Sequence, residues 1–379
     1  MNARSQRAKS MMEIKGHCSQ INQNQFQVRS QTDPSKFYMV SKTDDGLICE
    51  CPDHQTRKAD CKHIKIVLEI IKQNKCYKNN TFRIMERSKL QICKFCDSGN
   101  ITKKGFRKNK NGKIPKFKCK DCKREFTANF GFEKKQFDDR TITQSLQMYF
   151  QGMSVRDIAD NFEMMGIDVS FKTVYNWVSQ YSKLTSKYLD TIVPRVGTWV
   201  RADEAFIRVA GEMNYLFSTM DDETRFWIVG EMADTKFQHQ ADKLLVDTIK
   251  RTGQTPKIFI TDGLPAYGKS SKKVFGKNTN HISNVGINSM RKSGKIHPTN
   301  NMMERLNGEI RDREKVFRGL KKMDTPIIPG MKVYYNFTKK HGGLGGDITP
   351  SEAALIKVDG RNRWKTIIQN ASLHKENSV

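Results

Sequence analysis

The chain has 379 residues, which is long enough for two or three domains. Its 67 Lys and Arg exceed its 40 Asp and Glu, and the formal net charge of +27 favours a polyanionic partner, DNA or RNA, over a membrane. The longest apolar run is short and is broken by Lys65 and Glu69, which excludes a membrane span. The basic tail, residues 1–20, has no apolar core behind it, so we expect an intracellular protein without a signal peptide.

The first cysteine set lies in residues 21–80, between predicted strands and a predicted helix. Residues 26–30 and 37–42 alternate like strands, and residues 62–74 have helical periodicity. Cys49-x-Cys51 then leaves a strand end and Cys61-x-His63 opens a helix. This resembles the SWIM zinc finger, whose pattern is Cys-x-Cys followed by Cys-x-His. The resemblance implies one structural Zn²⁺ held by Cys49, Cys51, Cys61 and His63.

Other interpretations of this segment stay open. A reduced cysteine cluster with His63 as an ordinary helix-start residue is the alternative to zinc, and His54 is a possible competing ligand. Cys18 and Cys76 have no partner at metal-ligand spacing and are expected to be free thiols, because an intracellular chain seldom forms disulfides.

The second cysteine set predicts a zinc ribbon over residues 88–130. Cys93-x2-Cys96 and Cys119-x2-Cys122 have the spacing of a closed, tetrahedral four-thiolate site. Within the hairpin-like stretch between the two pairs, residues 98–118 are basic and contain no acid. We expect it to contact phosphates, although a solvated basic loop is the alternative. The candidate contacts are Lys103, Lys104, Arg107, Lys108 and Lys110.

Residues 139–186 predict three helices arranged as a helix-turn-helix. The helical pattern breaks at Gly152 and Gly166, and Ser154 and Ser170 stand where N-caps are expected. Residues 171–181 would be the recognition helix. Four of its side chains could face a major groove: Lys172, Tyr175, Asn176 and Gln180. The alternative is a small three-helix connector without base contacts.

From residue 197 onward the pattern changes to strands. Residues 198–209, 213–221 and 225–233 predict three consecutive strands, with gaps short enough for hairpins. A helix follows over residues 239–253, and residues 256–263 predict a further strand. This order resembles the ribonuclease H-like core, which is an antiparallel meander, a helix and then a parallel strand.

Three acids stand where they can converge within this segment. Asp203 lies in one strand, Asp262 ends another, and Glu304 stands on the first turns of a predicted helix. Converging carboxylates suit Mg²⁺, or Mn²⁺, because such ions prefer oxygen ligands. Two such ions about 3.5–4 Å apart can activate an attacking oxygen and stabilise a leaving one in phosphodiester chemistry.

Neighbouring charged residues compete for the same roles. Glu204 alternates with Asp203 to the opposite face of the strand, so one of the two is expected to point away from the site. Further along the helix, Glu309 faces a different direction from Glu304. Three basic residues follow on that helix and could either bind phosphates or form a solvated face: Arg311, Arg313 and Lys315.

Residues 195–357 resemble the DDE-type transposases of insertion sequences. The resemblance is carried in order by WVRADEAFIRV, NYLFSTMD, FITDGLPAY and NNMMERLNGEIRDREKVFRGLK. It implies DNA cleavage and strand transfer with Asp203, Asp262 and Glu304 as the metal-binding triad. The zinc ribbon and helix-turn-helix also resemble the DNA-binding region of this family. A SWIM-like finger is not a usual part of these enzymes, and the 41 residues between the second Asp and the Glu (304 − 262 − 1) are a long gap.

The predicted protein is therefore multidomain: small zinc modules, a helix-turn-helix, a ribonuclease H-like mixed-sheet catalytic domain and a C-terminal tail over residues 358–379. Its partners would be element ends and target DNA, and bringing two ends together implies at least a homodimer on DNA. Such a protein works in the cytoplasm or nucleoid. A catalytically silent transposase-derived DNA-binding protein is the main alternative, and a retroviral-type integrase or a ribonuclease H is another.

Overall fold

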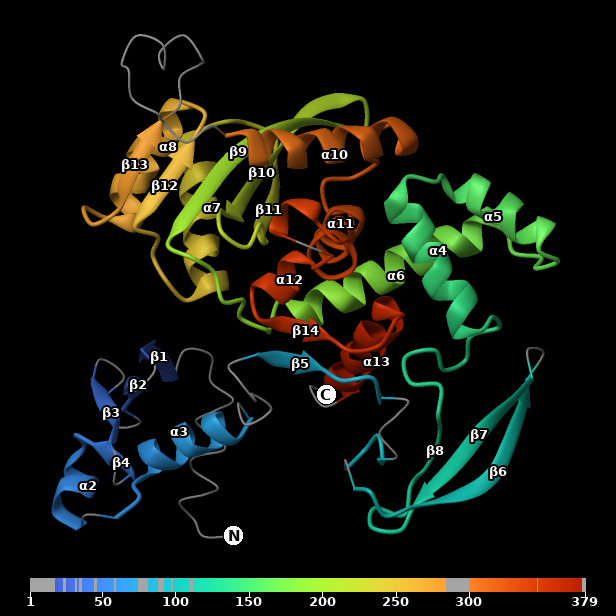
Figure 1. Cartoon of the computed structure of the whole chain (residues 1–379), viewed down its shortest axis with the longest axis horizontal. Coiled ribbons are helices and arrows are strands. Elements are labelled where there is room, and N and C mark those ends of the chain that lie inside the picture. Colours follow the sequence, from blue (N-terminus) through green and yellow to red (C-terminus); the bar gives the residue numbers. More distant parts are fainter. Residues whose placement is uncertain are drawn as a thin grey trace. The chain divides into compact units, whose positions relative to one another are not determined.

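The computed structural model describes residues 18–22, 25–30, 33, 36–43, 46–57, 59–73, 81–87, 92–96, 98–109, 112–283, 300–345 and 347–376. Most of the basic tail, Cys76 and Lys110 lie outside these residues. The chain divides into two compact units, residues 1–82 and 83–379 (Figure 1).

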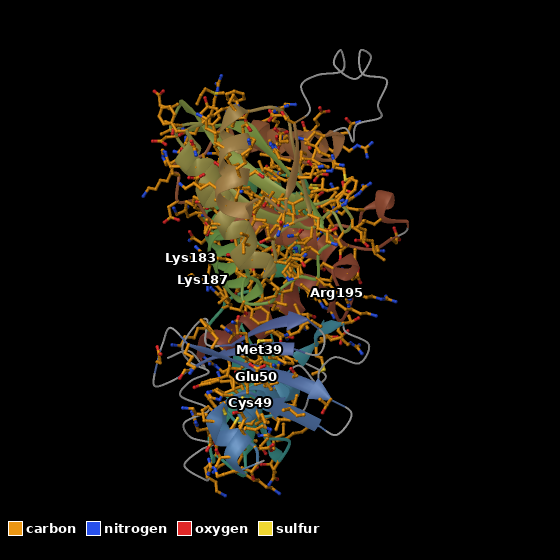
Figure 2. The ribbon with its side chains drawn as sticks, turned by 90° about the vertical axis from the view of Figure 1, so that its left-hand side faces the viewer. Met39, Cys49, Glu50, Lys183, Lys187 and Arg195 are labelled. Atoms are coloured by element: carbon orange, nitrogen blue, oxygen red, sulfur yellow. The ribbon has the colours of Figure 1, made fainter. Side chains whose placement is uncertain are left out.

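The first unit is built on a four-stranded antiparallel sheet in the order β1-β2-β3-β4. Its strands are β1 (Cys18–Asn22), β2 (Gln25–Arg29), β3 (Phe37–Thr43) and β4 (Gly46–Cys49), followed by α2 (Pro52–Arg57) and α3 (Lys62–Gln73). Phe26, Val28 and Val40 pack with Ile64 and Val67 of α3 in one core. The Glu50 N–H donates to the Met39 carbonyl (3.0 Å), so the β3–β4 pairing continues beyond Cys49 (Figure 2). The predicted strands and helix around the first cysteine set are confirmed.

Strand β5 (Phe82–Ile84) spans the sequence boundary between the two units, and a small antiparallel sheet follows it in the second unit. This sheet consists of β6 (Ile101–Asn109), β7 (Gly112–Cys119) and β8 (Glu125–Thr127), in that order. The hairpin expected between the two cysteine pairs is therefore confirmed. Its core is small and centres on Phe126 and Phe130, which pack beside Cys93 and Cys119.

Three helices follow: α4 (Asp139–Gln151), α5 (Val155–Met164) and α6 (Phe171–Leu189). Ser154 and Ser170 are the predicted N-caps, and each accepts the N–H three residues on, from Asp157 and Thr173. Gly152 ends α4 at a φ of 130°, where a residue with a side chain would be strained. Helix α6 continues to Leu189, eight residues beyond the predicted recognition helix (189 − 181), because its apolar period continues.

The largest sheet has the order β11-β10-β9-β12-β13. The strands β9 (Trp199–Val209), β10 (Glu212–Asp221) and β11 (Trp227–Ala233) form the predicted antiparallel meander. After α7 (Gln238–Thr252), strand β12 (Ile258–Thr261) runs parallel to β9 and pairs with β13 (Asn280–Ser283). Helix α8 (Pro265–Ser270) and the π-helix η4 (Ser271–Phe275) join these two strands. This mixed sheet with helices is the expected α+β, ribonuclease H-like arrangement.

Two helices cover opposite faces of this sheet (Figure 1). Paired residues on adjacent strands share a face, and successive residues alternate between faces. Thr219, which pairs with Ala202, bonds Thr248 of α7 (2.9 Å), so α7 covers the face that also carries Glu204. Helix α10 (Asn301–Phe317) packs against β9 and reaches Asp203 on the other face.

The remaining elements are α11 (Ile327–Val333), η5 (Tyr334–Thr338), η6 (Gly342–Leu344), α12 (Pro350–Ala353), β14 (Ile356–Val358) and α13 (Arg363–Glu376). Helix α6 packs against α11 and α13. Phe150 of α4 stacks on Tyr334 (6.1 Å between ring centroids) and on Trp364 (5.7 Å). The C-terminal elements are thereby fixed to the three-helix region. Within the described residues, no helix is both long and apolar enough to span a bilayer.

Candidate functional site

Three carboxylates converge at one edge of the large sheet. Asp203 lies within β9, and Asp262 directly follows β12, its parallel neighbour. Each of Asp203, Glu204 and Asp262 offers an oxygen within 4.8 Å of the others. Asp203 and Glu204 are buried, while Asp262 is exposed. The structure thus brings together the two predicted aspartates and adds an acid that had been treated as their rival.

Glu204 does not point away from this cluster, so the expectation that one of the adjacent acids would do so is wrong. The pairing of β12 with β9 extends only from Ile258↔Trp199 to Ile260↔Arg201. Beyond Arg201, β12 no longer pairs with β9. Side chains from both faces of β9 can therefore reach the space beside this strand. Glu204 accepts hydrogen bonds there from Lys236 Nζ (2.6 Å) and the Tyr267 hydroxyl (3.2 Å).

The electrostatics of the cluster favour a bound cation. Burial, followed by the charges of Asp262 and Glu204, raises the pKa of Asp203 to about 7, and Glu304 adds to the effect. Burial also raises the pKa of Glu204, although the hydrogen bond from Lys236 opposes the change. A divalent cation between these oxygens would offset their mutual repulsion, so the residues present fit a metal site.

Glu304 lies at the first turn of α10, on an exposed part of the helix. It is close enough to Asp203 to raise the pKa of that residue, but its oxygens are not among those within 4.8 Å of each other. Its rivals on α10 are engaged elsewhere. Glu309 pairs with Lys339 (2.5 Å), and Glu314 accepts the N–H of Arg208 (2.6 Å). Glu304 is therefore the acid of this helix nearest to completing the cluster.

Asn307 is a site residue that the sequence analysis missed. Its side chain is 3% exposed, and its Nδ2 donates to Asp203 Oδ2 (2.9 Å), while its Oδ1 has no partner in the described structure. It stands one helical turn after Glu304, and residues three apart on a helix lie on neighbouring positions of the same side. The three-residue spacing from Glu304 was the sequence signal that could have identified Asn307.

We expect Asn307→Ala to raise the Mg²⁺ concentration for half-maximal DNA cleavage by about 10–100-fold, the usual cost of losing a group that orients a metal ligand. The carboxylate of Asp203 would lose the hydrogen bond that fixes its orientation. A titration of cleavage rate against Mg²⁺ measures the change, and excess metal should recover most of the activity.

Asp312→Ala is the matched control, because Asp312 is exposed on the same helix and pairs only with Lys315 among the described residues. It should leave the Mg²⁺ dependence unchanged. An Asn307→Ala protein whose cleavage is lost at every Mg²⁺ concentration, with a lowered unfolding temperature, would mean that Asn307 only holds α10 in place.

Arg313 was predicted to be a candidate phosphate contact, and the structure contradicts this prediction. Its side chain is buried rather than exposed, and its guanidinium lies over the ring of Tyr149 (4.6 Å). Burial lowers the pKa of Arg313, and its three guanidinium nitrogens have no hydrogen-bond partner in the described structure. In this arrangement Arg313 joins α10 to α4 and cannot reach a ligand on the surface. Arg311 and Lys315 are exposed, as a phosphate contact requires.

The second cysteine set is arranged as a four-thiolate metal site. Two sulfur pairs, Cys93–Cys122 and Cys96–Cys119, are each separated by 3.6 Å. A tetrahedral ion with Zn–S bonds of about 2.3 Å places its sulfurs about 3.8 Å apart. All four sulfurs lie within 4.8 Å of one another, so their geometry fits Zn²⁺.

The first cysteine set is similarly close, and it contains an imidazole. His63 Nδ1 lies 3.8 Å from the sulfur of Cys49 and 3.9 Å from that of Cys61. The pKa of Cys61 is lowered, first by its hydrogen bond with Cys49, and the thiolate is the form that binds metal. His54 does not join this group, because its Nδ1 contacts the Ala59 carbonyl (2.9 Å). The four predicted ligands therefore fit one Zn²⁺.

The predicted nucleic-acid contacts are largely accessible. Lys103, Lys104 and Arg107 are exposed on β6, while Lys108 lies on the same strand. On α6 the exposed side chains are Lys172, Tyr175, Asn176 and Gln180, and the last of these accepts a hydrogen bond from Lys135 (2.6 Å). They stand on the side of α6 opposite its buried Val174, Trp177 and Val178.

Parts of the chain match known proteins, and one of these matches covers the segment that carries the carboxylates. A family model described as a DDE domain matches residues 197–341, and one for an ATPase subunit of terminase (gpP-like) matches residues 140–192. The transposase for insertion sequence element IS257 in transposon Tn4003, from Staphylococcus aureus, is 28% identical over 147 residues, which are 38% of this chain and 63% of that protein. The transposase for insertion sequence-like element IS431mec, from S. aureus strain Mu50, matches with the same identity and coverage.

Solved structures with similarity include the catalytic core domain of HTLV-2 integrase in complex with magnesium. It is 12% identical with a TM-score of 0.31, and the match covers 43% of this chain and 98% of that one. A simian T-cell lymphotropic virus intasome with a PP2A regulatory subunit is also 12% identical, with a TM-score of 0.32 and coverage of 55% and 73%.

The match to the curated transposases spans less than two thirds of their length. The match to the DDE model covers the residues that include Asp203, Asp262 and Glu304. Residues 197–341 of this chain match the DDE domain family, and the chain is similar in part to transposases of insertion sequences.

Proposed function

We propose that this protein is a DNA transposase that binds the ends of a mobile element and catalyses metal-dependent DNA cleavage and strand transfer. The observation that carries the proposal is the meeting of Asp203 and Asp262 at the open edge of β9, with Glu304 on the adjacent helix. The shared DDE domain supports the reaction class. The protein would work in the cytoplasm or nucleoid, as at least a dimer on DNA, because two element ends must be held together.

Asp203, Asp262 and Glu304 would hold two Mg²⁺ or Mn²⁺ ions. When bound, such a pair supplies Lewis-acid activation of an attacking oxygen and stabilisation of the leaving one. The residues of the chain position these groups. Asn307 fixes the carboxylate of Asp203, and Lys236 with Tyr267 fixes that of Glu204. The carboxylates bind the ions and do not attack the DNA, so no covalent enzyme intermediate is needed.

The two cysteine sets would form structural zinc modules, a SWIM-like finger and a zinc ribbon. Helices α4 to α6 would form a helix-turn-helix that reads the element ends, and the exposed cations of β6 would bind phosphates without regard to sequence. The main alternative remains a catalytically silent DNA-binding protein, although both aspartates and the glutamate are present.

Substrate preference tests this function against a ribonuclease H. The duplex substrates would carry the inverted repeats that a transposase gene is expected to have at its flanks, and matched RNA–DNA hybrids would supply the competitor. We expect Mg²⁺-dependent cleavage at the ends of the repeats and little cutting of the hybrid. Preferential degradation of the RNA strand would assign the fold to ribonuclease H activity instead.

We expect Asn176→Ala together with Gln180→Ala to lower the preference for element ends over random DNA, by about 1–3 kcal/mol for each lost base contact. Both side chains are exposed on α6 and can read base edges. Binding titrations against specific and random duplexes measure the change.

The matched experiment replaces Lys103, Lys104 and Arg107 of β6 with Gln. The loss of these positive charges should weaken DNA binding to every sequence alike, and the affinity should then depend less on salt concentration. The assignment of roles is reversed if the β6 variant loses sequence preference and the α6 variant keeps it.

A further inference from the structure

A polar pocket lies between helix α4, the segment after η5, and the start of α13. Its volume is about 450 Å³. The lining side chains include four cations and no acid, and the rest are mostly amides and hydroxyls: Arg140, Thr143, Gln144, Gln147, Thr338, Lys340, Arg361, Asn362, Arg363 and Trp364. A pocket with this charge selects an anionic ligand.

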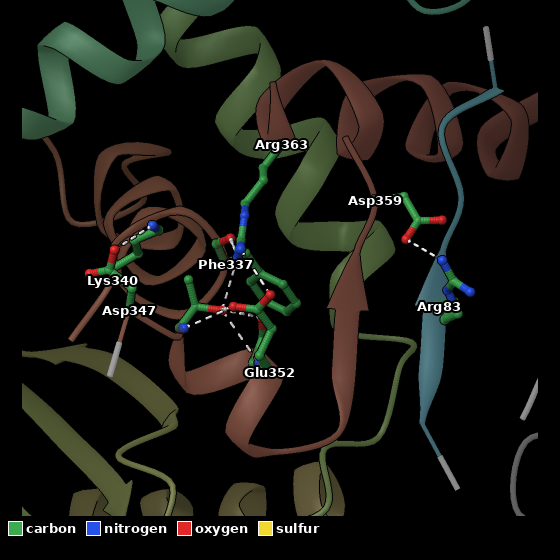
Figure 3. A network of polar contacts seen from close by, with 9 residues as sticks. Arg83, Phe337, Lys340, Asp347, Glu352, Asp359 and Arg363 are labelled. Carbon is green, nitrogen blue, oxygen red and sulfur yellow. Dashed lines mark hydrogen bonds and ion pairs between the residues drawn. The ribbon is translucent and has the colours of Figure 1, made fainter. Parts of the chain in front are cut away.

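Hydrogen bonds join residues that line the pocket from different elements. Asn362 Nδ2 donates to the Thr143 hydroxyl (2.7 Å), and the indole N–H of Trp364 donates to Gln147 Oε1 (3.0 Å). The guanidinium of Arg363 is engaged with the Phe337 carbonyl (3.1 Å) and with Glu352 (2.9 Å), as Figure 3 shows. Arg363 therefore supports the wall rather than offering its donors to a ligand.

The rim presents the available positive charge. Arg140 and Arg361 are exposed, and neither pairs with an acid in the part of the chain that the structure describes. The nearest acid in sequence to Arg140 is Asp139, which is already bound to Lys365 (2.7 Å). Lys340 also lies at the rim and pairs with the exposed Asp347 (2.9 Å), an ion pair that water weakens (Figure 3).

We propose that this pocket binds a phosphodiester of the DNA backbone, held by Arg140 and Arg361 with Lys340 beside them. The planar fork of an arginine matches two phosphate oxygens, and two forks at one rim surround such a group. The bound phosphate would attach the DNA to the surface where α4 meets the C-terminal elements. This inference rests on the proposed function in one respect, namely that the chain binds DNA.

The test compares three proteins in titrations of a random-sequence duplex at several salt concentrations: wild type, Arg140→Gln/Arg361→Gln, and Lys257→Gln/Lys277→Gln. The control pair removes the same charge from exposed positions just before β12 and β13, which neither line the pocket nor belong to α6. We expect the pocket variant to bind about tenfold more weakly and its slope of log affinity against log salt to fall by about two. The control pair should change both quantities much less.

Two further variants distinguish the loss of phosphate contacts from the loss of the folded structure. Arg140→Lys/Arg361→Lys keeps the charge and should restore most of the slope, and single Arg361→Gln should lower the slope by about one. An unchanged unfolding temperature and an unchanged cleavage rate at saturating DNA would show that the fold and the reacting centre are intact. A pocket variant equal to the control pair overturns the inference and leaves the proposed function standing.

Free phosphate and DNA share the chemistry that this pocket recognises, so a second titration uses inorganic phosphate and pyrophosphate alone. We expect no binding to either below millimolar concentration. Submicromolar to micromolar binding that Arg140→Gln/Arg361→Gln abolishes, with the DNA salt slope unchanged, would assign the pocket to a free anion. A wild-type protein that binds no DNA at any salt concentration would refute the proposed function and this inference together.

Discussion

Asp203→Asn, Asp262→Asn and Glu304→Gln are each expected to abolish DNA cleavage while leaving DNA binding nearly intact. Each change removes a metal-binding charge and keeps nearly the same side-chain volume. The loss should exceed about 100-fold, the upper end of what is lost when a group that merely supports a ligand is removed. Single-turnover cleavage and duplex binding, measured on the same preparations, give the two quantities.

The positions of the three carboxylates explain why their replacement should abolish cleavage and leave DNA binding nearly intact. Most of the exposed cations proposed to hold DNA lie on β6, on α6 and around the pocket beside α4, whereas the three acids lie on β9, at the end of β12 and on α10. Asp312→Asn is the control, because Asp312 is an exposed acid on the same helix as Glu304. Near wild-type strand transfer by any one of the three variants would remove that residue from the site.

Removal of zinc should unfold both cysteine-containing modules. Their apolar cores are small, and metal binding to such sites contributes on the order of 10 kcal/mol or more to folding. We expect about two zinc ions per chain by metal analysis, with one lost in Cys119→Ser and the other in Cys61→Ser. A strong chelator should lower the temperature of thermal unfolding and weaken DNA binding.

Cys18→Ser is the matched control, since Cys18 has no partner at metal-ligand spacing in the sequence. It should leave the zinc content and the unfolding temperature unchanged. A stoichiometry near one in the wild-type protein would eliminate one module, and the SWIM-like set, with its single imidazole ligand, would be the one to discard.

Much of the catalytic domain could be predicted from the sequence, because local residue patterns define the order of its strands and helices. The strands β9 to β11 have short connections that allow only hairpins, and Gly253 ends α7 where it was expected. The serine caps of α5 and α6 are equally local signals. The continuation of α6 from residue 181 to Leu189 was missed although its apolar period was visible in the sequence, and the helix packs against α11 and α13.

The site itself was less predictable where it depends on tertiary pairing. Strand alternation correctly placed Glu204 and Asp203 on opposite faces, yet the early end of the β12–β9 pairing lets both reach the same cluster. Arg313 looked like its basic neighbours until α4 was seen to bury it against Tyr149. Asn307 was overlooked because a neutral amide gives no charge signal, although its spacing from Glu304 was visible.

The most direct measurement incubates the purified protein with Mg²⁺ and labelled DNA carrying the element ends, together with a supercoiled target plasmid. The account predicts nicks at the element ends that leave a free 3′-hydroxyl, followed by products in which that end is joined to the target. Both products should depend on the divalent metal and on Asp203. A protein that binds the ends tightly but yields neither product at any Mg²⁺ or Mn²⁺ concentration would contradict the account and favour a silent DNA-binding protein.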